Sequence, residues 1–399
     1  MENKPNLSRA EDAADQPAAG THHLPTVINA RIPVLDGLRG IAILSVLLFH
    51  IHITVANGDP RSHLGWAGVD LFFVVSGFLI TGILFDSRHK SNYYRVFYAR
   101  RTLRIFPLYY VALLGFFVVF PAVLRVTHHA DSIDPVIRPS SQIFAWFYVM
   151  NWLIGFRGFS AVSSFLQHFW SLSIEEQFYL CWPFVVKRVT SRLLMPICAV
   201  LILLSPILRV VLYRLDMPWA AYAWTVCRCD SLAVGALIAI AARHLRAWDI
   251  LSHWSSPVAI AAVLALVGII AARKTAFYLD SWMGTVGLSF LALLFGASLV
   301  IALNAGQSSR LSAALRFGPL RFFGKYSYAI YVFHWPVMRA LAWKNFTEDH
   351  LAAAVHGRFT AFLLVSSVSI ALSVLLALIS WNVLEKRCSN LKEHPWLKR

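Results

Sequence analysis

Ten long apolar stretches separated by short polar segments constrain the fold of this chain more than any other feature. They fall at about 34–56, 66–86, 105–124, 170–186, 193–213, 229–243, 257–272, 283–303, 324–343 and 359–384. A helix crosses the hydrocarbon core of a bilayer with about 20 mostly apolar residues. The pattern therefore predicts an all-α, polytopic integral membrane protein with about ten transmembrane helices. A further apolar stretch, 141–156, is too short to span comfortably and is expected to be re-entrant or interfacial.

The charge of the chain is distributed as in a membrane protein. The formal net charge of +16 would suit a nucleic-acid-binding protein, but hydrophobic residues make up 58% of the chain. If the N-terminus is cytoplasmic, the inside segments hold 23 Lys and Arg residues and the outside segments hold 10. Because positive residues gather in cytoplasmic loops, this asymmetry predicts that both termini are cytoplasmic. We therefore expect a multi-pass protein of the cell inner (cytoplasmic) membrane, with the lipid bilayer rather than nucleic acid as its partner.

Polar composition divides the chain into three parts. Residues 1–33 are expected to form a disordered cytoplasmic tail, 34–385 a membrane domain, and 386–399 a cytoplasmic C-terminal tail. No soluble domain is evident, so any chemistry must be built from membrane helices and short loops. The five cysteines suggest no disulfide framework, and no metal site is expected. His168 belongs to the longest non-cytoplasmic stretch, 125–169, where a histidine on a polar loop is expected to be solvated.

Ionisable residues inside the apolar stretches are candidates for function, because buried charge in a membrane is costly. In a helix, Arg39 and His50 lie within about 20° of one face and about 16 Å apart along the axis. A cation at one end and an imidazole at the other would suit a long ligand. The alternative is that Arg39 snorkels to headgroups and His50 bonds a neighbouring helix. Asp70, near the outer end of the next stretch, is a plausible partner for His50.

Two further groups of polar residues stand near the predicted membrane faces. Arg101 and Arg104 point the same way at i, i+3, and guanidinium groups suit phosphate oxygens, although positive-inside anchoring also explains them. Glu175 lies about one turn below the outer surface, with Ser171 on its face and Arg228 as a candidate partner. Ser76, beside a glycine, is expected to serve helix packing.

The stretch 324–343 places Tyr328, Tyr331 and His334 on one broad face. His334 falls near mid-membrane, where a hydrogen bond to a neighbouring helix is the simpler explanation. The outer halves of several stretches thus each supply a polar group, and such convergence is what an active-site vestibule requires.

Six segments in order carry a family resemblance: LDGLRGIAILSVLLFH, GVDLFFVVSGFLI, RRTLRIFPLYY, FWSLSIEEQFYL, CDSLAVGALIA and GKYSYAIYVFHWP. Together they resemble the acyltransferase-3 family of polytopic membrane acyltransferases. The resemblance implies a ten-helix O-acyltransferase that moves an acyl group, usually acetyl from acetyl-CoA, to an extracytoplasmic carbohydrate or lipid-linked glycan such as O-antigen or exopolysaccharide. Some relatives carry a C-terminal esterase-like domain, and its absence here is expected to weaken the peptidoglycan option.

The family patterns fall on particular residues of this chain. The Arg-ten residues-His pattern falls on Arg39 and His50, the Arg-x-x-Arg pattern on Arg101 and Arg104, and the expected acidic residue on Glu175. The three arginines would bind the CoA phosphates, and Tyr331 and His334 are assigned to the donor-binding side.

His50 would accept the hydroxyl proton as a general base, or would itself be acylated. Glu175 or Asp70 would hold its tautomer. Tyr331, Ser171 and Arg228 are candidate oxyanion donors.

Two other functions fit the same polar residues. A proton-coupled membrane transporter would also use intramembrane Arg, His and Glu, although the chain shows no internal repeat. An acyltransferase acting on a small-molecule acceptor would share the donor side. A non-catalytic scaffold does not explain polar residues at costly depths.

Overall fold

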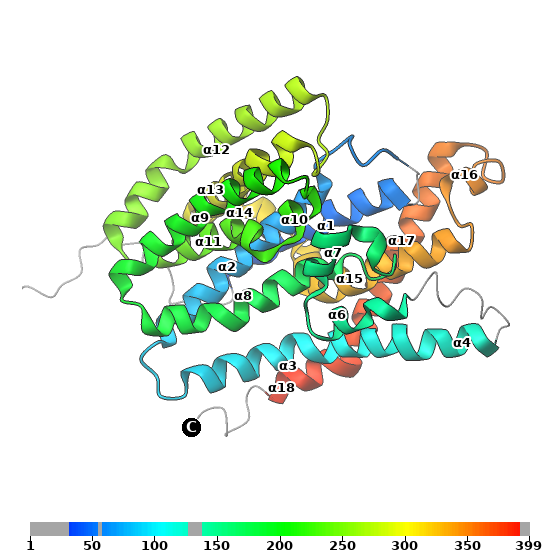
Figure 1. Ribbon diagram of the computed structural model, residues 1–399, viewed down its shortest axis with the longest axis horizontal. Coiled ribbons are helices and arrows are strands. Elements are labelled where there is room, and N and C mark those ends of the chain that lie inside the picture. Colours follow the sequence, from blue (N-terminus) through cyan, green and yellow to red (C-terminus); the bar gives the residue numbers. More distant parts are fainter. Residues whose placement is uncertain (1–31, 55–57, 127–137, 392–399) are drawn as a thin grey trace, which may run out of the picture.

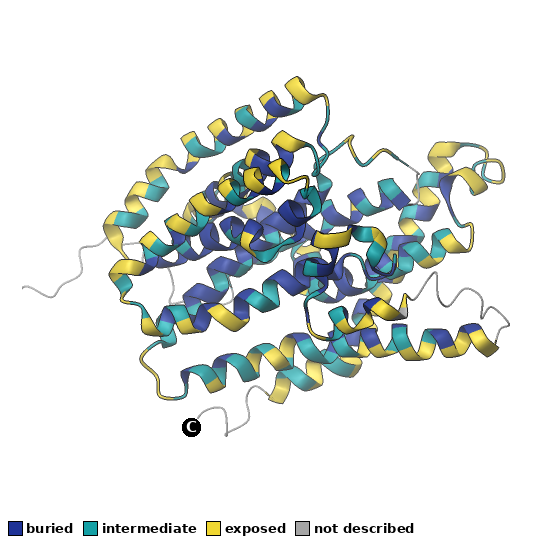
Figure 2. Ribbon diagram, in the orientation of Figure 1, coloured by how far each residue is buried: buried dark blue, intermediate teal, exposed yellow. Residues whose placement is uncertain are grey.

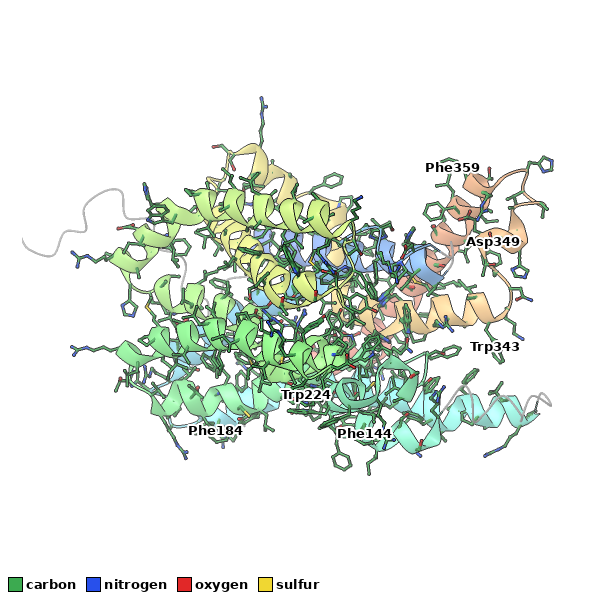
Figure 3. All side chains as sticks on the ribbon, turned by 45° about the horizontal axis from the view of Figure 1, so that its top comes forward. Phe144, Phe184, Trp224, Trp343, Asp349 and Phe359 are labelled. Atoms are coloured by element: carbon green, nitrogen blue, oxygen red, sulfur yellow. The ribbon has the colours of Figure 1, made fainter. Side chains whose placement is uncertain are left out.

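A computed structural model describes residues 32–54, 58–126 and 138–391, and every regular element within these ranges is helical. The predicted N-terminal tail lies outside the described residues except for its last two positions. Figure 1 shows the long helices running roughly along one direction, so that the molecule has two ends. The side chains labelled in Figure 3 place Phe184 toward one end and Trp343, Asp349 and Phe359 at the other.

Five helices form most of the interior of the bundle, where Figure 2 shows predominantly buried residues. These helices are α1 (Pro33–Thr54), α2 (Gly68–Ser87), α8 (Phe169–Arg188), α11 (Thr225–Ala241) and α15 (Gly318–Trp343).

The remaining long helices cover this interior. They are α3 (Tyr93–Leu114), which continues through the π-helical turn η3 (Gly115–Val119) into α4 (Phe120–Val126); α9 (Ser191–Arg214); α12 (Leu245–Arg273); η7 (Met283–Gly287) with α13 (Leu288–Asn304); and α17 (Arg358–Ser380), which continues through η8 (Trp381–Glu385) into α18 (Lys386–Asn390).

Large apolar side chains point outward from these covering helices, as Val118, Leu203, Leu264 and Leu375 do. Such a surface would be unfavourable in water and is compatible with lipid.

Short helices complete the ends of the bundle. They are η2 (Gly65–Ala67), η5 (Pro139–Ser141), α6 (Gln142–Trp146), α7 (Met150–Arg157), η6 (Phe159–Ala161), α10 (Pro218–Ala223), α14 (Arg310–Leu315) and α16 (Glu348–Leu351). The predicted short stretch 141–156 corresponds to α6 and α7. Gln177 of α8 anchors α7 by donating hydrogen bonds to Tyr148 O and Asn151 Oδ1, at 2.7 and 2.9 Å.

The ten predicted stretches each fall on a long helix, and the chain is a multi-pass membrane protein. Eight helical segments of the described chain are long and apolar enough to cross a membrane. The other two predicted spans are α8 and α15, which have sufficient length, at 20 and 26 residues, but are too polar to meet the same criterion. Helix starts differ most: α3 begins at Tyr93 and α12 at Leu245, 12 residues before each predicted span, because polar residues there continue the helix beyond its apolar part.

Glycines allow the interior helices to cross closely. A side chain at Gly37 or Gly40 of α1 would clash with the backbone of Leu315 or Leu320, and one at Gly324 of α15 would clash with α1. Small residues in membrane helices permit this close backbone approach. The α1–α15 contact places two helices that are far apart in sequence side by side. It thereby positions the side chains described next.

Candidate active site

Two cavities meet inside the bundle. The first, which we call the arginine cavity, is lined by charged and polar side chains of four helices: Arg39, Ser76, Arg101, Arg104 and Glu175, with Tyr328 and Tyr331 from a fifth. The second, which we call the histidine cavity, is lined by His50 and His168 and by aromatic side chains that include Trp66, Trp170, Tyr222, Tyr278 and Trp335. Val69 and Tyr331 line both cavities, so the two adjoin at these residues.

The arginine cavity offers cationic hydrogen-bond donors. Within the described part of the chain, the guanidinium groups of Arg39, Arg101 and Arg104 form neither an ion pair nor a hydrogen bond. Arg101 instead packs with its guanidinium carbon 5.8 Å from the centre of the Tyr179 ring. Glu175 accepts a hydrogen bond from Ser76 Oγ at 2.8 Å and places a carboxyl group in the cavity wall. The cavity therefore combines three cations with one acid, and its donors can serve an anionic ligand.

In the histidine cavity, His50 is hydrogen-bonded to a second histidine. Its Nδ1 lies 2.8 Å from Nε2 of His334, and the two rings stack with centres 5.0 Å apart. His334 Nδ1 lies 2.7 Å from the carbonyl oxygen of Tyr331, in the preceding turn of α15. His334 is fully buried, whereas His50 is partly exposed and borders the cavity. The hydrogen bond that the sequence predicted between His334 and a neighbouring helix is thus made to His50 of α1.

Pro336 in α15 leaves a backbone carbonyl free to accept a hydrogen bond from the third histidine, His168. Pro336 has no N–H, so it leaves the carbonyl of Val332, four residues earlier, without its usual helical donor. His168 Nε2 lies 3.3 Å from this carbonyl oxygen and supplies a donor. Since a carbonyl only accepts, His168 carries its proton on Nε2 and leaves Nδ1 bare. This Nδ1 is buried and has no hydrogen-bond partner among the described residues.

Tyr331 connects the two cavities through a short hydroxyl network. Its hydroxyl lies 2.6 Å from Ser171 Oγ and donates to the backbone carbonyl of His168 at 3.0 Å. Both side chains are buried. Ser171 of α8 is therefore hydrogen-bonded to Tyr331 of α15. The hydrogen bond that Glu175 accepts comes from Ser76, although Ser171 and Glu175 are four residues apart on the same helix.

The structure does not place Asp70 beside His50. Asp70 Oδ1 pairs with Arg228 Nη2 at 2.5 Å, both side chains are about 1% exposed, and Asp70 lines neither cavity. Arg228 also lies over the Trp170 and Tyr222 rings, at 5.7 and 5.2 Å. The predicted pairing of Asp70 with His50 is therefore wrong, because a buried carboxylate needs a cation and α11 provides one.

A second buried pair holds neighbouring helices together. Arg209 of α9 pairs with Asp230 of α11 at 2.8 Å and donates to the carbonyl of Thr285 at 2.9 Å. Ser289 Oγ donates to the same carboxylate at 3.0 Å. With both arginines of this region paired to aspartates, Arg228 is not the partner of Glu175 that the sequence suggested.

Sequence reasoning missed two residues of the site. His168 was expected to be solvated, yet it is buried and borders the histidine cavity. Its position directly before the polar-aromatic start of α8 was the available signal. Ser76 was expected only to pack, yet it binds Glu175. Glu175 itself lines the arginine cavity and not the histidine cavity, so it does not orient His50.

Comparisons with known proteins identify the family of the chain. Residues 32–378 match the family model described as an acyltransferase domain. The peptidoglycan O-acetyltransferase OatA of Listeria monocytogenes is 32% identical over 321 residues, which cover 77% of this chain and 49% of that protein. The O-acetyltransferase OatA of Staphylococcus aureus is 28% identical over 375 residues, covering 89% of this chain and 56% of that protein.

The chain spans about half the length of these curated relatives, and no solved structure matches it. The family model nevertheless covers nearly all of the described helices, including every residue that lines the two cavities. The chain therefore belongs to the acyltransferase family that its six sequence segments predicted.

Proposed function

We propose that this protein is a membrane O-acyltransferase that moves an acyl group, acetyl in the simplest case, from cytoplasmic acyl-CoA to a hydroxyl of an extracytoplasmic carbohydrate. One observation carries the proposal: a cation-lined cavity adjoins a histidine-lined cavity inside the bundle, and Tyr331 and Val69 belong to both. A donor on one side and an acceptor on the other would meet at this junction.

The donor side is inferred from the free donors of the arginine cavity. Guanidinium groups suit phosphate oxygens because their N–H groups form a planar fork. Arg39, Arg101 and Arg104 lie in the halves of α1 and α3 that the distribution of positive charge assigns to the cytoplasm. These three residues would hold the phosphates of acyl-CoA, and the thioester would reach toward Tyr331.

The acceptor side is inferred from the walls of the histidine cavity. Aromatic faces such as Trp170 and Tyr222 offer apolar surface, and the histidines add a few polar groups, a mixture typical of small-ligand sites. A sugar has apolar C–H faces and hydroxyl edges and would match both. The names of the two relatives, which specify O-acetylation and in one case peptidoglycan, support a carbohydrate of the cell envelope as the acceptor.

His50 would perform the proton transfers. Its Nε2 removes the proton of the acceptor hydroxyl as the oxygen forms a bond to the thioester carbonyl carbon. The carbon–sulfur bond then breaks, and the imidazolium returns the proton to the departing sulfur, so His50 ends as it began. This direct transfer uses no acyl-histidine intermediate.

Turnover by the full-length protein in lipid nanodiscs tests the proposal. We expect wild type supplied with acetyl-CoA and cell-envelope carbohydrate to release free CoA thiol and to form base-labile acetyl esters. His50→Ala should reduce both by at least about 100-fold, since general-base catalysis contributes about 10²–10⁴-fold. His52→Ala, two residues along α1 and outside both cavities, serves as the matched control and should retain turnover. Absence of thiol release by well-folded wild type, together with substrate-driven proton movement in proteoliposomes, would favour the transporter instead.

A further inference from the structure

We propose that His334 is a positioning residue that fixes the tautomer of His50, so that His50 presents an unprotonated Nε2 to the histidine cavity. The inference deepens the proposed function and rests on it for its catalytic meaning. It reassigns His334 from the donor-binding side, where the sequence placed it, to the base.

The first step concerns the proton on His334. Its Nδ1 lies 2.7 Å from the carbonyl oxygen of Tyr331, and a carbonyl oxygen only accepts hydrogen bonds. His334 Nδ1 must therefore carry a proton. In a neutral imidazole the other nitrogen, Nε2, is then an acceptor.

The second step transfers this constraint to His50. Nε2 of His334 lies 2.8 Å from His50 Nδ1, so His50 must donate and must carry its proton on Nδ1. The remaining nitrogen of His50, Nε2, is left bare, and it makes no hydrogen bond within the described part of the chain. A bare ring nitrogen is what a general base needs.

The third step excludes a protonated His334, which would donate from both nitrogens and reverse the order. The titratable groups around it are His50, His168 and Tyr331, whose ring centres lie 5.0, 5.3 and 5.3 Å from the centre of the His334 ring. None of the three imidazoles forms an ion pair within the described residues. An isolated charge in a fully buried position of a membrane protein is costly, so the neutral form is favoured.

The arrangement is similar to a catalytic triad in which the group that orients the histidine base is a second histidine instead of a carboxylate. In serine hydrolases a carboxylate orients the histidine base and stabilises its charged form. Here a backbone carbonyl orients one neutral imidazole, which in turn orients the next. The arrangement fixes the tautomer without placing a negative charge inside the bundle.

Nuclear magnetic resonance of the full-length protein with ¹⁵N-labelled histidine in nanodiscs tests the tautomer without any acyl transfer. The His50 signals are assigned by their loss in His50→Gln. We expect wild type to show His50 protonated on Nδ1, and His334→Phe, which keeps a ring but removes the acceptor, to lose this preference. A wild-type His50 protonated on Nε2, or one that is unchanged in His334→Phe, would overturn the proposal.

Kinetics then test the consequence for catalysis. His334→Phe should lower kcat about 100-fold and leave the KM for acetyl-CoA within about twofold, because the arginine cavity is untouched. His334→Gln, whose amide oxygen can accept from His50 Nδ1, should recover activity to within about tenfold of wild type. Equal losses in Phe and Gln variants that fold normally, judged by thermal melting, would contradict a tautomer role.

The two experiments separate the inference from the proposed function. If the resonances show the expected tautomer but wild type releases no CoA thiol, the proposed function fails and the assignment of His334 stands. If wild type turns over and the tautomer is the opposite one, only the inference about His334 fails.

Discussion

Arg101 and Arg104 are separated by one turn of α3 and direct unpaired guanidinium groups into one cavity. A lysine at either position keeps the positive charge that favours cytoplasmic placement but loses the planar fork. The two explanations of these arginines, membrane anchoring and phosphate binding, therefore predict different behaviour for a double variant in which both are replaced by lysine.

We predict that Arg101→Lys/Arg104→Lys raises the apparent KM for acetyl-CoA at least tenfold while the protein inserts normally. The reason is the loss of charge-assisted hydrogen bonds worth about 1.5–3 kcal/mol each. The measurement is a titration of acetyl-CoA against wild type and variant in matched membranes. Arg100→Lys, on the same helix but outside the cavity, is the control. Superimposable curves for wild type and the double variant would leave these arginines as anchors only.

At the scale of single residues, the sequence predicted positions better than partners. Arg39, His50, Arg101, Arg104 and Glu175 all line one of the two cavities, because polar residues in apolar stretches must face the interior. Their hydrogen-bond partners come from helices distant in sequence, and periodicity within one helix carries no information about those. Asp70 and Ser76 were misjudged for this reason.

At the scale of elements, α15 makes the largest number of contacts that define the candidate site. The helix supplies Tyr331 and His334, and Pro336 opens its backbone to His168 without lining either cavity. An internal proline normally destabilises a helix by about 3 kcal/mol or more, and the donor that His168 supplies to the Val332 carbonyl offsets part of this loss.

We predict that Pro336→Ala separates stability from activity. The new N–H can bond the Val332 carbonyl and should leave the melting temperature equal to or above that of wild type. His168 would lose its acceptor and turn, and acyl transfer should fall by about tenfold, a loss typical of disturbed supporting contacts. Thermal melting and thiol release are measured on the same preparation. Unchanged turnover would show that the contact between His168 and Val332 does not matter for the site.

The existence of the elements followed from the sequence, but their extent did not. Apolar runs located all ten long helices, whereas α3 and α12 extend well beyond their apolar parts. Hydropathy reports which residues lipid tolerates, and helical hydrogen bonding continues into polar surroundings until a breaker or a turn ends it.

At the scale of the whole molecule, the two cavities lie toward opposite ends of the bundle. Arg39 is near the start of α1 and His50 near its end, whereas α8 has the opposite order, with His168 directly before its start and Glu175 further along the helix. If the charge asymmetry sets the orientation, the arginine cavity faces the cytoplasm and both termini lie there.

We predict that reporter fusions will place the C-terminus in the cytoplasm. Green fluorescent protein fused after Arg399 should fluoresce, because it folds in that compartment, and alkaline phosphatase at the same site should be inactive. A matched pair of fusions in the 274–281 loop should give the reverse result. Phosphatase activity at Arg399 would show that the topology is the inverse of the predicted one and that the donor side faces away from the cytoplasm.

The polarity of α8 and α15 has a consequence for how the protein is made. These two helices supply Ser171, Glu175, Tyr331 and His334, and they are the two predicted spans that are too polar to be counted among the eight apolar ones. Their retention in the bilayer must come from neighbours, and the principal neighbour of α15, α1, is synthesised nearly three hundred residues earlier. His50 therefore acquires its hydrogen-bond partner only after most of the sequence has been synthesised. A chain that ended before α15 would hold His50 without the His334 nitrogen to which it is hydrogen-bonded.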